Sequence, residues 1–237
     1  MPPALASPAR DTVIFLHGLA RTGRAFLLAE QVFRAAGYHT HAPDYPSTRA
    51  RIDTLLDHVD TAVAAAGRGH VHFVTHSLGG ILVRAWLEKR RPNLHGRIVM
   101  LAPPNRGTEV IDRFGHWRVL RSVAGPVADE LGTRPESVPN QLGPVRGEVG
   151  VIAGTLSVNP VFSAVISGRD DGCVGVEQTR VAGMRDHIVI PATHSFLMNN
   201  PLVLAQTLVF LRSGHLLHGL PSGEVLAHAW RLHAAQG

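Results

Sequence analysis

The residue best placed to act as a nucleophile is Ser77, in the segment THSLGG over residues 75–80. An apolar run suited to a buried strand leads into the serine, and Gly79 and Gly80 follow it. A strand that turns sharply into a helix lifts a serine hydroxyl off the sheet, and small residues are needed around such a turn. Thr75 stands where the usual G-x-S-x-G pattern has glycine, so the motif here is T-x-S-x-G. The alternative is a serine that caps the helix, followed by glycines needed only for packing.

A serine nucleophile needs a histidine to take its proton and a carboxylate to orient that histidine. The sequence holds fifteen histidines, so the choice of a base needs more than residue type. His194 lies in PATHSF, a predicted loop between the last strand and the last clear helix. GRDDGCVG, residues 168–175, offers two adjacent carboxylates, Asp170 and Asp171. Because Asp-Gly is a favoured turn pair, one of these aspartates also has a purely structural interpretation.

Other residues of suitable type lack a supporting pattern. No motif prepares Cys173 as a nucleophile, and we expect it to be a small hydrophobe beside a strand. Ser195 has no tight turn around it. His39 and His41 would share one strand face, which could suit a metal ion, but no further ligands accompany them. We therefore expect no metal site.

Strand and helix signals alternate from residue 12 to residue 213. Apolar runs predict the strands, and apolar residues at helical spacing predict the helices between them. This alternation implies an α/β fold with a parallel sheet covered by helices on both faces. The expected strands are 12–18, 38–46, 70–75, 97–102, 149–154 and 187–191, and the expected helices are 24–36, 48–66, 78–90 and 200–214.

Residues 103–148 are much longer than a usual connection between two strands and are rich in Gly, Pro and Arg. One helical piece is expected near 109–122. A long insertion within a compact domain is typical of a lid or a binding loop, so we expect a cap-like insertion here. Phe114 and Trp117 within it either line an acyl pocket or anchor the insertion to the core.

Residues 214–237 carry weaker signals and are expected to be a C-terminal tail with a short helix at 223–234. The length of 237 residues suits one large α/β domain with a full hydrophobic core. We therefore predict that residues 1–237 form a single domain.

Five segments occur together in an order that is found in one known family. They are HGLARTG after the first strand, the THSLGG turn, LAPPNRGT after the next strand, DDGCV, and a histidine after the last strand. Together they resemble the α/β-hydrolase fold, in particular its lipase- and esterase-like members, over roughly residues 12–213. The resemblance implies the mostly parallel sheet that the alternation also predicts.

The resemblance also implies roles for individual residues. In this fold the triad follows the chain order serine, acid, histidine, which makes Ser77 the nucleophile and His194 the base. The acid commonly precedes a glycine and then a hydrophobic residue, which selects Asp171. The backbone N–H groups of Leu19 and Leu78 would form the oxyanion hole. No cofactor is expected.

These assignments predict a serine hydrolase that cleaves a small-molecule or lipid carboxylic ester through an acyl-enzyme. A thioesterase or an acyltransferase would use the same three residues with a different leaving group or acceptor. A member of the fold that binds a ligand or partner without catalysis is an alternative from another functional class.

Composition argues against several other classes. The net charge of +5 comes almost entirely from arginines interleaved with acids, and no nucleic-acid-binding motif accompanies it. The opening MPPALASPARD lacks the pattern of a secretory signal, and no apolar run is long enough to span a bilayer. A single cysteine excludes an internal disulfide. We expect a cytoplasmic enzyme that binds no nucleic acid; the oligomeric state is left open.

Overall fold

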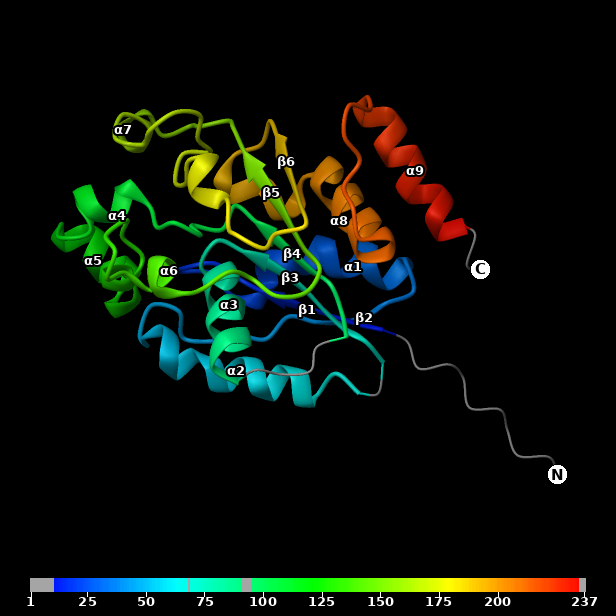
Figure 1. Ribbon diagram of the computed structural model, residues 1–237, viewed down its shortest axis with the longest axis horizontal. Helices are drawn as coiled ribbons and strands as arrows, with labels where there is room; N and C mark the ends of the chain where they lie inside the picture. Colours follow the sequence, from blue (N-terminus) through cyan, green and yellow to red (C-terminus); the bar gives the residue numbers. More distant parts are fainter. Residues whose placement is uncertain (1–10, 68, 91–94, 235–237) are drawn as a thin grey trace.

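A computed structural model describes residues 11–67, 69–90 and 95–234 of the chain. The opening residues 1–10, in which we expect no secretory signal, lie outside this part. Within it, six strands form one parallel sheet in the order β2-β1-β3-β4-β5-β6, as Figure 1 shows. The strands are β1 (Thr12–Leu16), β2 (His39–His41), β3 (Val71–His76), β4 (Ile98–Leu101), β5 (Val149–Gly154) and β6 (Asp186–Ile190). The predicted parallel sheet is confirmed.

Helices cover both faces of the sheet, which is why nearly every residue of its inner strands is buried, rather than alternate ones. Ile14 and Leu16 point into a core shared with α2 and α3, whereas Val13 and Phe15 point into a core shared with α1 and α8. These helices are α1 (Leu27–Ala35), α2 (Ile52–Ala64), α3 (Leu78–Arg90) and α8 (Pro201–Ser213). The sheet is therefore a rigid platform for the loops at its edges.

Some boundaries differ from those expected. The strand predicted over 38–46 spans only β2, because Pro43 and Pro46 cannot donate to a strand ladder. The helix predicted over 24–36 begins with a 3₁₀ turn, Gly23–Phe26, before α1.

In the described residues, no helix is long and apolar enough to span a bilayer. The cytoplasmic location stays a prediction.

The segment 103–148 contains several short helices where one helical piece was expected near 109–122. Gly115 follows the first of them, and the extended backbone of Trp117 (φ −67°, ψ 129°) separates it from the second. The helical pieces are α4 (Glu109–Phe114), α5 (Arg118–Ala124), a 3₁₀ turn (Pro126–Glu130) and α6 (Val138–Gln141). The single-domain organisation and the cap-like function of this insertion stay predictions.

The expected short helix near 223–234 is α9 (Ser222–Ala234), which packs against α8 (Figure 1). Val225 and Ala229 form an apolar cluster with Ala205 and Val209 of α8. Residues 214–234 are thus better packed than the expectation of a tail suggests, and residues 235–237 of the expected tail lie outside the described residues.

Arg84 on α3 connects the core to the 103–148 segment. Its side chain is buried, and its Nη1 donates to the backbone oxygen of Asn105 at 2.9 Å. Its Nη2 donates to the carbonyls of Pro139, Leu142 and Gly143 at 3.2, 3.1 and 3.4 Å. Burial lowers the pKa of Arg84 to about 10, so the guanidinium remains charged at neutral pH. One buried cation therefore satisfies carbonyls from two parts of the segment.

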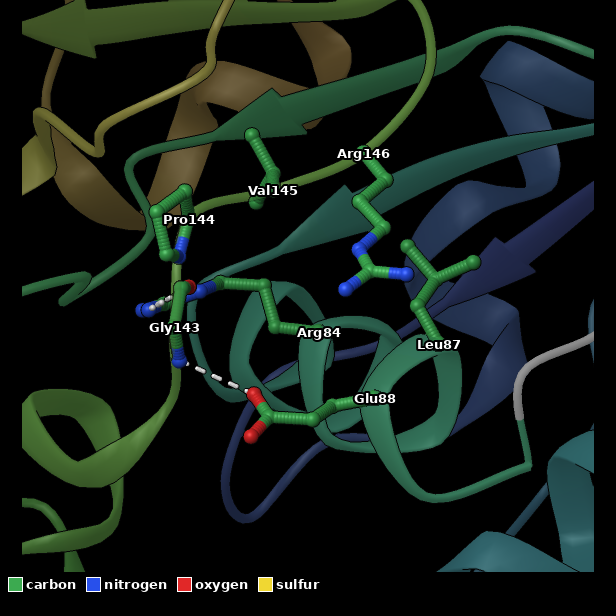
Figure 2. A pocket seen from close by; sticks show the side chains of 7 residues that line it. All are labelled: Arg84, Leu87, Glu88, Gly143, Pro144, Val145 and Arg146. Carbon is green, nitrogen blue, oxygen red and sulfur yellow. Dashed lines mark hydrogen bonds between the residues drawn. The ribbon is translucent and has the colours of Figure 1, made fainter.

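Arg84 also lines a cavity of about 270 Å³ between α3 and the residues that lead into β5; Figure 2 shows this cavity and the contact of Arg84 with Gly143. The Glu88 carboxylate accepts the backbone N–H of Gly143 at 2.9 Å. Arg84 and Glu88, one helical turn apart, thus bind the carbonyl and the amide of the same glycine. This two-sided contact fixes the segment against α3.

We predict that Arg84→Met destabilises the protein by about 3 kcal/mol, because several buried carbonyls lose a charged donor. Arg90→Met is a matched control on the same helix, since Arg90 is exposed and pairs with the exposed Asp57 and Asp60. It should change the free energy of unfolding little. Urea unfolding followed by circular dichroism measures both variants, and equal small effects would contradict the role given to Arg84.

Candidate active site

Ser77 lies at the junction of β3 and α3 with a strained backbone. Its φ of +52° falls in the left-handed region that residues other than glycine rarely adopt. The strain is held by hydrogen bonds on both sides: Ser77 N–H donates to Leu101 O, and Gly80 N–H donates to Ser77 O, both at 2.9 Å. A serine that only capped the helix would have an extended backbone instead. The local geometry is that of a sharp strand-to-helix turn.

The glycines after Ser77 allow α3 to approach the sheet closely. A Cβ added at Gly79 would lie 2.3 Å from the carbonyl oxygen of Leu16, and one at Gly80 would lie 2.8 Å from Cβ of Pro103. Thr75, which replaces the usual glycine, is buried, and its hydroxyl has no hydrogen-bond partner in the described part of the chain. The threonine therefore fits, at the cost of an unpaired buried hydroxyl.

The structure brings Ser77, His194 and Asp171 together from three loops. Nε2 of His194 lies 3.1 Å from Oγ of Ser77, and its Nδ1 lies 2.8 Å from Oδ2 of Asp171. The backbone N–H of His194 also donates to the carbonyl oxygen of Asp171 at 2.9 Å. All three residues follow the carboxyl ends of parallel strands, which meet at one edge of the sheet. The three residues that the family resemblance selects thus form a continuous hydrogen-bonded row, with His194 between Ser77 and Asp171.

The two adjacent aspartates have different partners. Oδ1 of Asp171 accepts the backbone N–H groups of Cys173 and Val174 at 3.0 and 2.9 Å, which leaves Oδ2 for His194. Oδ1 of Asp170 instead accepts the hydroxyl of Ser163 at 2.6 Å and the backbone N–H of Gly172 at 2.7 Å. Asp171 is nearly fully buried. Asp170 stabilises the turn, and only Asp171 contacts the histidine.

The two N–H groups expected to bind an oxyanion belong to loops next to Ser77. Leu78 follows the serine directly, and Leu19 follows Gly18, where an added Cβ would lie 3.3 Å from Cβ of Ser77. β1 and β3 pair in parallel, with Leu16 opposite Thr75, so the loops that follow them must lie side by side. Among the backbone hydrogen bonds of the described residues, none has the amide N–H of Leu19 or Leu78 as its donor. Both remain available to a ligand oxygen.

Two residues beside this row have roles that the sequence did not predict. Tyr45 is buried; its ring stacks on His17 at 3.8 Å, and its hydroxyl donates to the carbonyl oxygen of His17. His76, immediately before Ser77, is buried against His194. Burial lowers the pKa of His17 and lowers that of His76 further. No local pattern indicates these contacts, because the partners lie far apart in the chain.

The remaining candidates do not join the row. Burial, reinforced by the charge of Asp171, raises the pKa of Cys173 to about 12, so its thiol stays protonated at neutral pH. In the described residues, no group of three His, Cys, Asp or Glu side chains could hold a metal ion. His39 and His41 lie on the edge strand β2. The absence of a metal and of a cofactor stays a prediction.

Phe114 anchors the insertion. It is 6% exposed and clusters with Val110 and Ile166, and its ring stacks on Phe162 at 5.5 Å. Trp117 packs edge-on against it at 4.7 Å but is half exposed. This cluster is separate from the two main cores, so Phe114 joins the insertion to residues 162–166 rather than to the core as one interpretation expected. The acyl-pocket interpretation stays a prediction.

The fold and this site define a class of protein. A model of the alpha/beta hydrolase family matches residues 13–229, which is most of the chain. The chain therefore belongs to the alpha/beta hydrolase family, and the expected fold class is confirmed. No curated protein sequence matches it.

Solved structures of lipases and esterases are similar to it. Lipase BlEst2 of Bacillus licheniformis, in its mature form, has a TM-score of 0.67 and 18% identity, covering 90% of this chain and 96% of that one. Phospholipase PlaB of Legionella pneumophila gives 0.65 and 18%, covering 95% of this chain and 64% of that one. A metagenomic carboxyl esterase gives 0.63 and 15%, covering 99% and 78%. At such identities the likeness concerns the fold alone.

The close approach at Gly79 generates a prediction about stability. Gly79→Ala should lower the free energy of unfolding by about 3 kcal/mol, since the new Cβ would collide with a backbone carbonyl that cannot move without disturbing β1. Gly223→Ala is the control, because no atom lies within 4 Å of a Cβ built there. Chemical denaturation compares the two variants. A Gly79→Ala protein as stable as the control would refute the tight packing at this turn.

Proposed function

We propose that this protein is a serine hydrolase that cleaves a carboxylic ester through an acyl-enzyme, with Ser77, His194 and Asp171 as its catalytic triad. The observation that carries the proposal is the row of contacts at 3.1 and 2.8 Å that ends at a serine with positive φ. Family membership and the likeness to a lipase, a phospholipase and a carboxyl esterase support the ester as substrate.

In the proposed reaction, His194 takes the proton of Ser77 as its Oγ attacks the ester carbonyl. Asp171 accepts the Nδ1–H of His194, which fixes the tautomer with a bare Nε2 and stabilises the imidazolium. The N–H groups of Leu19 and Leu78 receive the negative charge on the carbonyl oxygen. The alcohol leaves with the proton from His194. His194 then takes a proton from water, whose oxygen attacks the carbonyl of the acyl-enzyme, and returns that proton to Oγ of Ser77 as the acid leaves.

A thioesterase or an acyltransferase would use the same triad, and a protein that only binds a ligand would need none of it. Within the described part of the chain, the amides of Leu19 and Leu78 donate no backbone hydrogen bond, and two free donors beside the serine favour catalysis over simple binding. A screen of p-nitrophenyl esters and thioesters of graded acyl length separates the enzymatic alternatives. The acyl length, the head group and the oligomeric state are left to that screen and to solution measurements.

We predict that a fluorophosphonate probe labels Ser77 and no other serine. Ser77→Ala should abolish labelling and lower kcat about 10⁶-fold, as removal of a triad nucleophile does. Ser195→Ala is the matched control, because Ser195 is exposed beside His194 in sequence and should leave both readouts unchanged. Mass spectrometry of the labelled peptide and initial rates on a short-chain ester measure the effects. Labelling at Ser195, or full turnover by Ser77→Ala, would favour the non-catalytic alternative.

The two aspartates provide a second test. Asp171→Asn should lower kcat about 10⁴-fold, because an amide at this position favours the wrong histidine tautomer. Asp170→Asn should cost less than about tenfold, since Asp170 supports a turn without contacting His194. Both variants are compared by initial rates after thermal melting has shown that they fold. A mild effect of Asp171→Asn would remove it from the triad.

A further inference from the structure

His76 is a buried imidazole next to the nucleophile that the proposed mechanism does not use. Only 2% of the residue is exposed, so it cannot exchange protons with solvent directly. Its ring lies 4.8 Å from the ring of His194, tilted by 50°. It therefore contacts the proposed base without lying in the row that leads to Ser77.

The contacts of His76 define its protonation state. Nε2 lies 2.9 Å from the backbone carbonyl oxygen of His194, and a carbonyl only accepts, so Nε2 carries the hydrogen. Burial, together with the charge of His194, lowers the pKa of His76 well below its usual value. The ring is then neutral, with a bare Nδ1 that has no partner in the described part of the chain. Nδ1 faces Gly18, where an added Cβ would approach it to 2.8 Å.

This contact completes the fixation of the main chain at His194. On one side, its N–H donates to the carbonyl oxygen of Asp171 at 2.9 Å. On the other side, its carbonyl accepts from His76, which is part of β3. The 3₁₀ turn that starts at His194 exposes Phe196 by 68%, so solvent lies on the outer side of this segment. The bond from His76 connects the main chain of the proposed base directly to the strand that leads into the nucleophile.

We propose that His76 is a positioning residue: its Nε2–H holds the carbonyl of His194 and thereby sets the imidazole at hydrogen-bond distance from Ser77. This inference rests on the proposed function, because it concerns the same reaction. His76 acts through His194 and does not touch the substrate. A displacement of about 1 Å between reacting groups costs roughly 100-fold in rate, so one such bond is enough to matter.

The neutral state of the His76 ring is part of its proposed positioning role. His194 becomes a cation when it takes the proton of Ser77, and a second cation 4.8 Å away would oppose that step. His17 and Arg21 also act on His76, and both disfavour a proton on its ring. A neutral donor can hold the base through the whole cycle without competing for its charge.

The test compares His76→Gln with His76→Met. Glutamine keeps an N–H donor at about the position of Nε2, whereas methionine keeps much of the volume and has no donor. We expect His76→Met to lower kcat roughly 100-fold with KM changed less than about threefold, because binding groups remain in place. His76→Gln should recover kcat to within about fivefold of the parent, because the carbonyl of His194 keeps its donor. The rate of fluorophosphonate labelling should follow kcat in both variants.

Three results would overturn the inference. One is a folded His76→Met variant with the parent kcat, and another is a His76→Gln variant as slow as His76→Met. The third result needs no variant. We expect ¹⁵N NMR of the parent to report His76 as neutral at pH 7 with its hydrogen on Nε2. The Nδ1–H tautomer would exclude the hydrogen bond from His76 to the carbonyl of His194. An inactive parent that resists the probe at Ser77 would instead refute the proposed function, so the two failures are distinguishable.

Discussion

The site depends on one constraint, the sharp turn at Ser77 between β3 and α3. The positive φ of the serine is stable only if the helix that follows lies almost in contact with β1, where Leu16 O leaves no room for a side chain at Gly79. The same closeness brings the loop after β1 beside the serine, because β1 and β3 pair directly. The strain at Ser77 and the close packing at Gly79 thus both belong to the same close approach of α3 to β1. The rest of the fold holds both in place.

Burial of the sheet on both faces explains how this strain is maintained. Two separate apolar cores fix β1 and β3, and α3 is buried along most of its length between the sheet, α2 and the 103–148 segment. Arg84 extends this fixation to the insertion through backbone carbonyls rather than through a carboxylate partner. The loops that bear Asp171 and His194 are then joined to a sheet that is packed on both faces. Such an arrangement suits chemistry that requires distances correct within fractions of an ångström.

Much of the fold could be predicted from the sequence, because buried parallel strands are continuous apolar runs and each helix has its own periodicity. The sharp turn at Ser77 could be predicted because two glycines follow the serine closely in sequence. The choice of Asp171 over Asp170 rested on the family resemblance, because both aspartates accept a backbone amide two residues later and only the contact with His194 distinguishes them. The break of the helix expected near 109–122 into α4 and α5 could not be predicted, since it depends on how these two helices pack. His76 could not be assigned a role either, because its partner lies 118 residues away and no periodicity encodes that contact.

Three histidines surround the turn, and their surroundings differentiate them. His17 and His76 are buried among apolar and aromatic groups, and each bonds a backbone carbonyl, an arrangement that stabilises a neutral ring with one fixed tautomer. His194 alone of the three has a carboxylate within hydrogen-bond distance, and it alone contacts the serine hydroxyl. Burial and one aspartate therefore give three identical side chains different chemical surroundings. Under the proposed mechanism, His194 is therefore the one ring of the three that is placed to take the proton of Ser77.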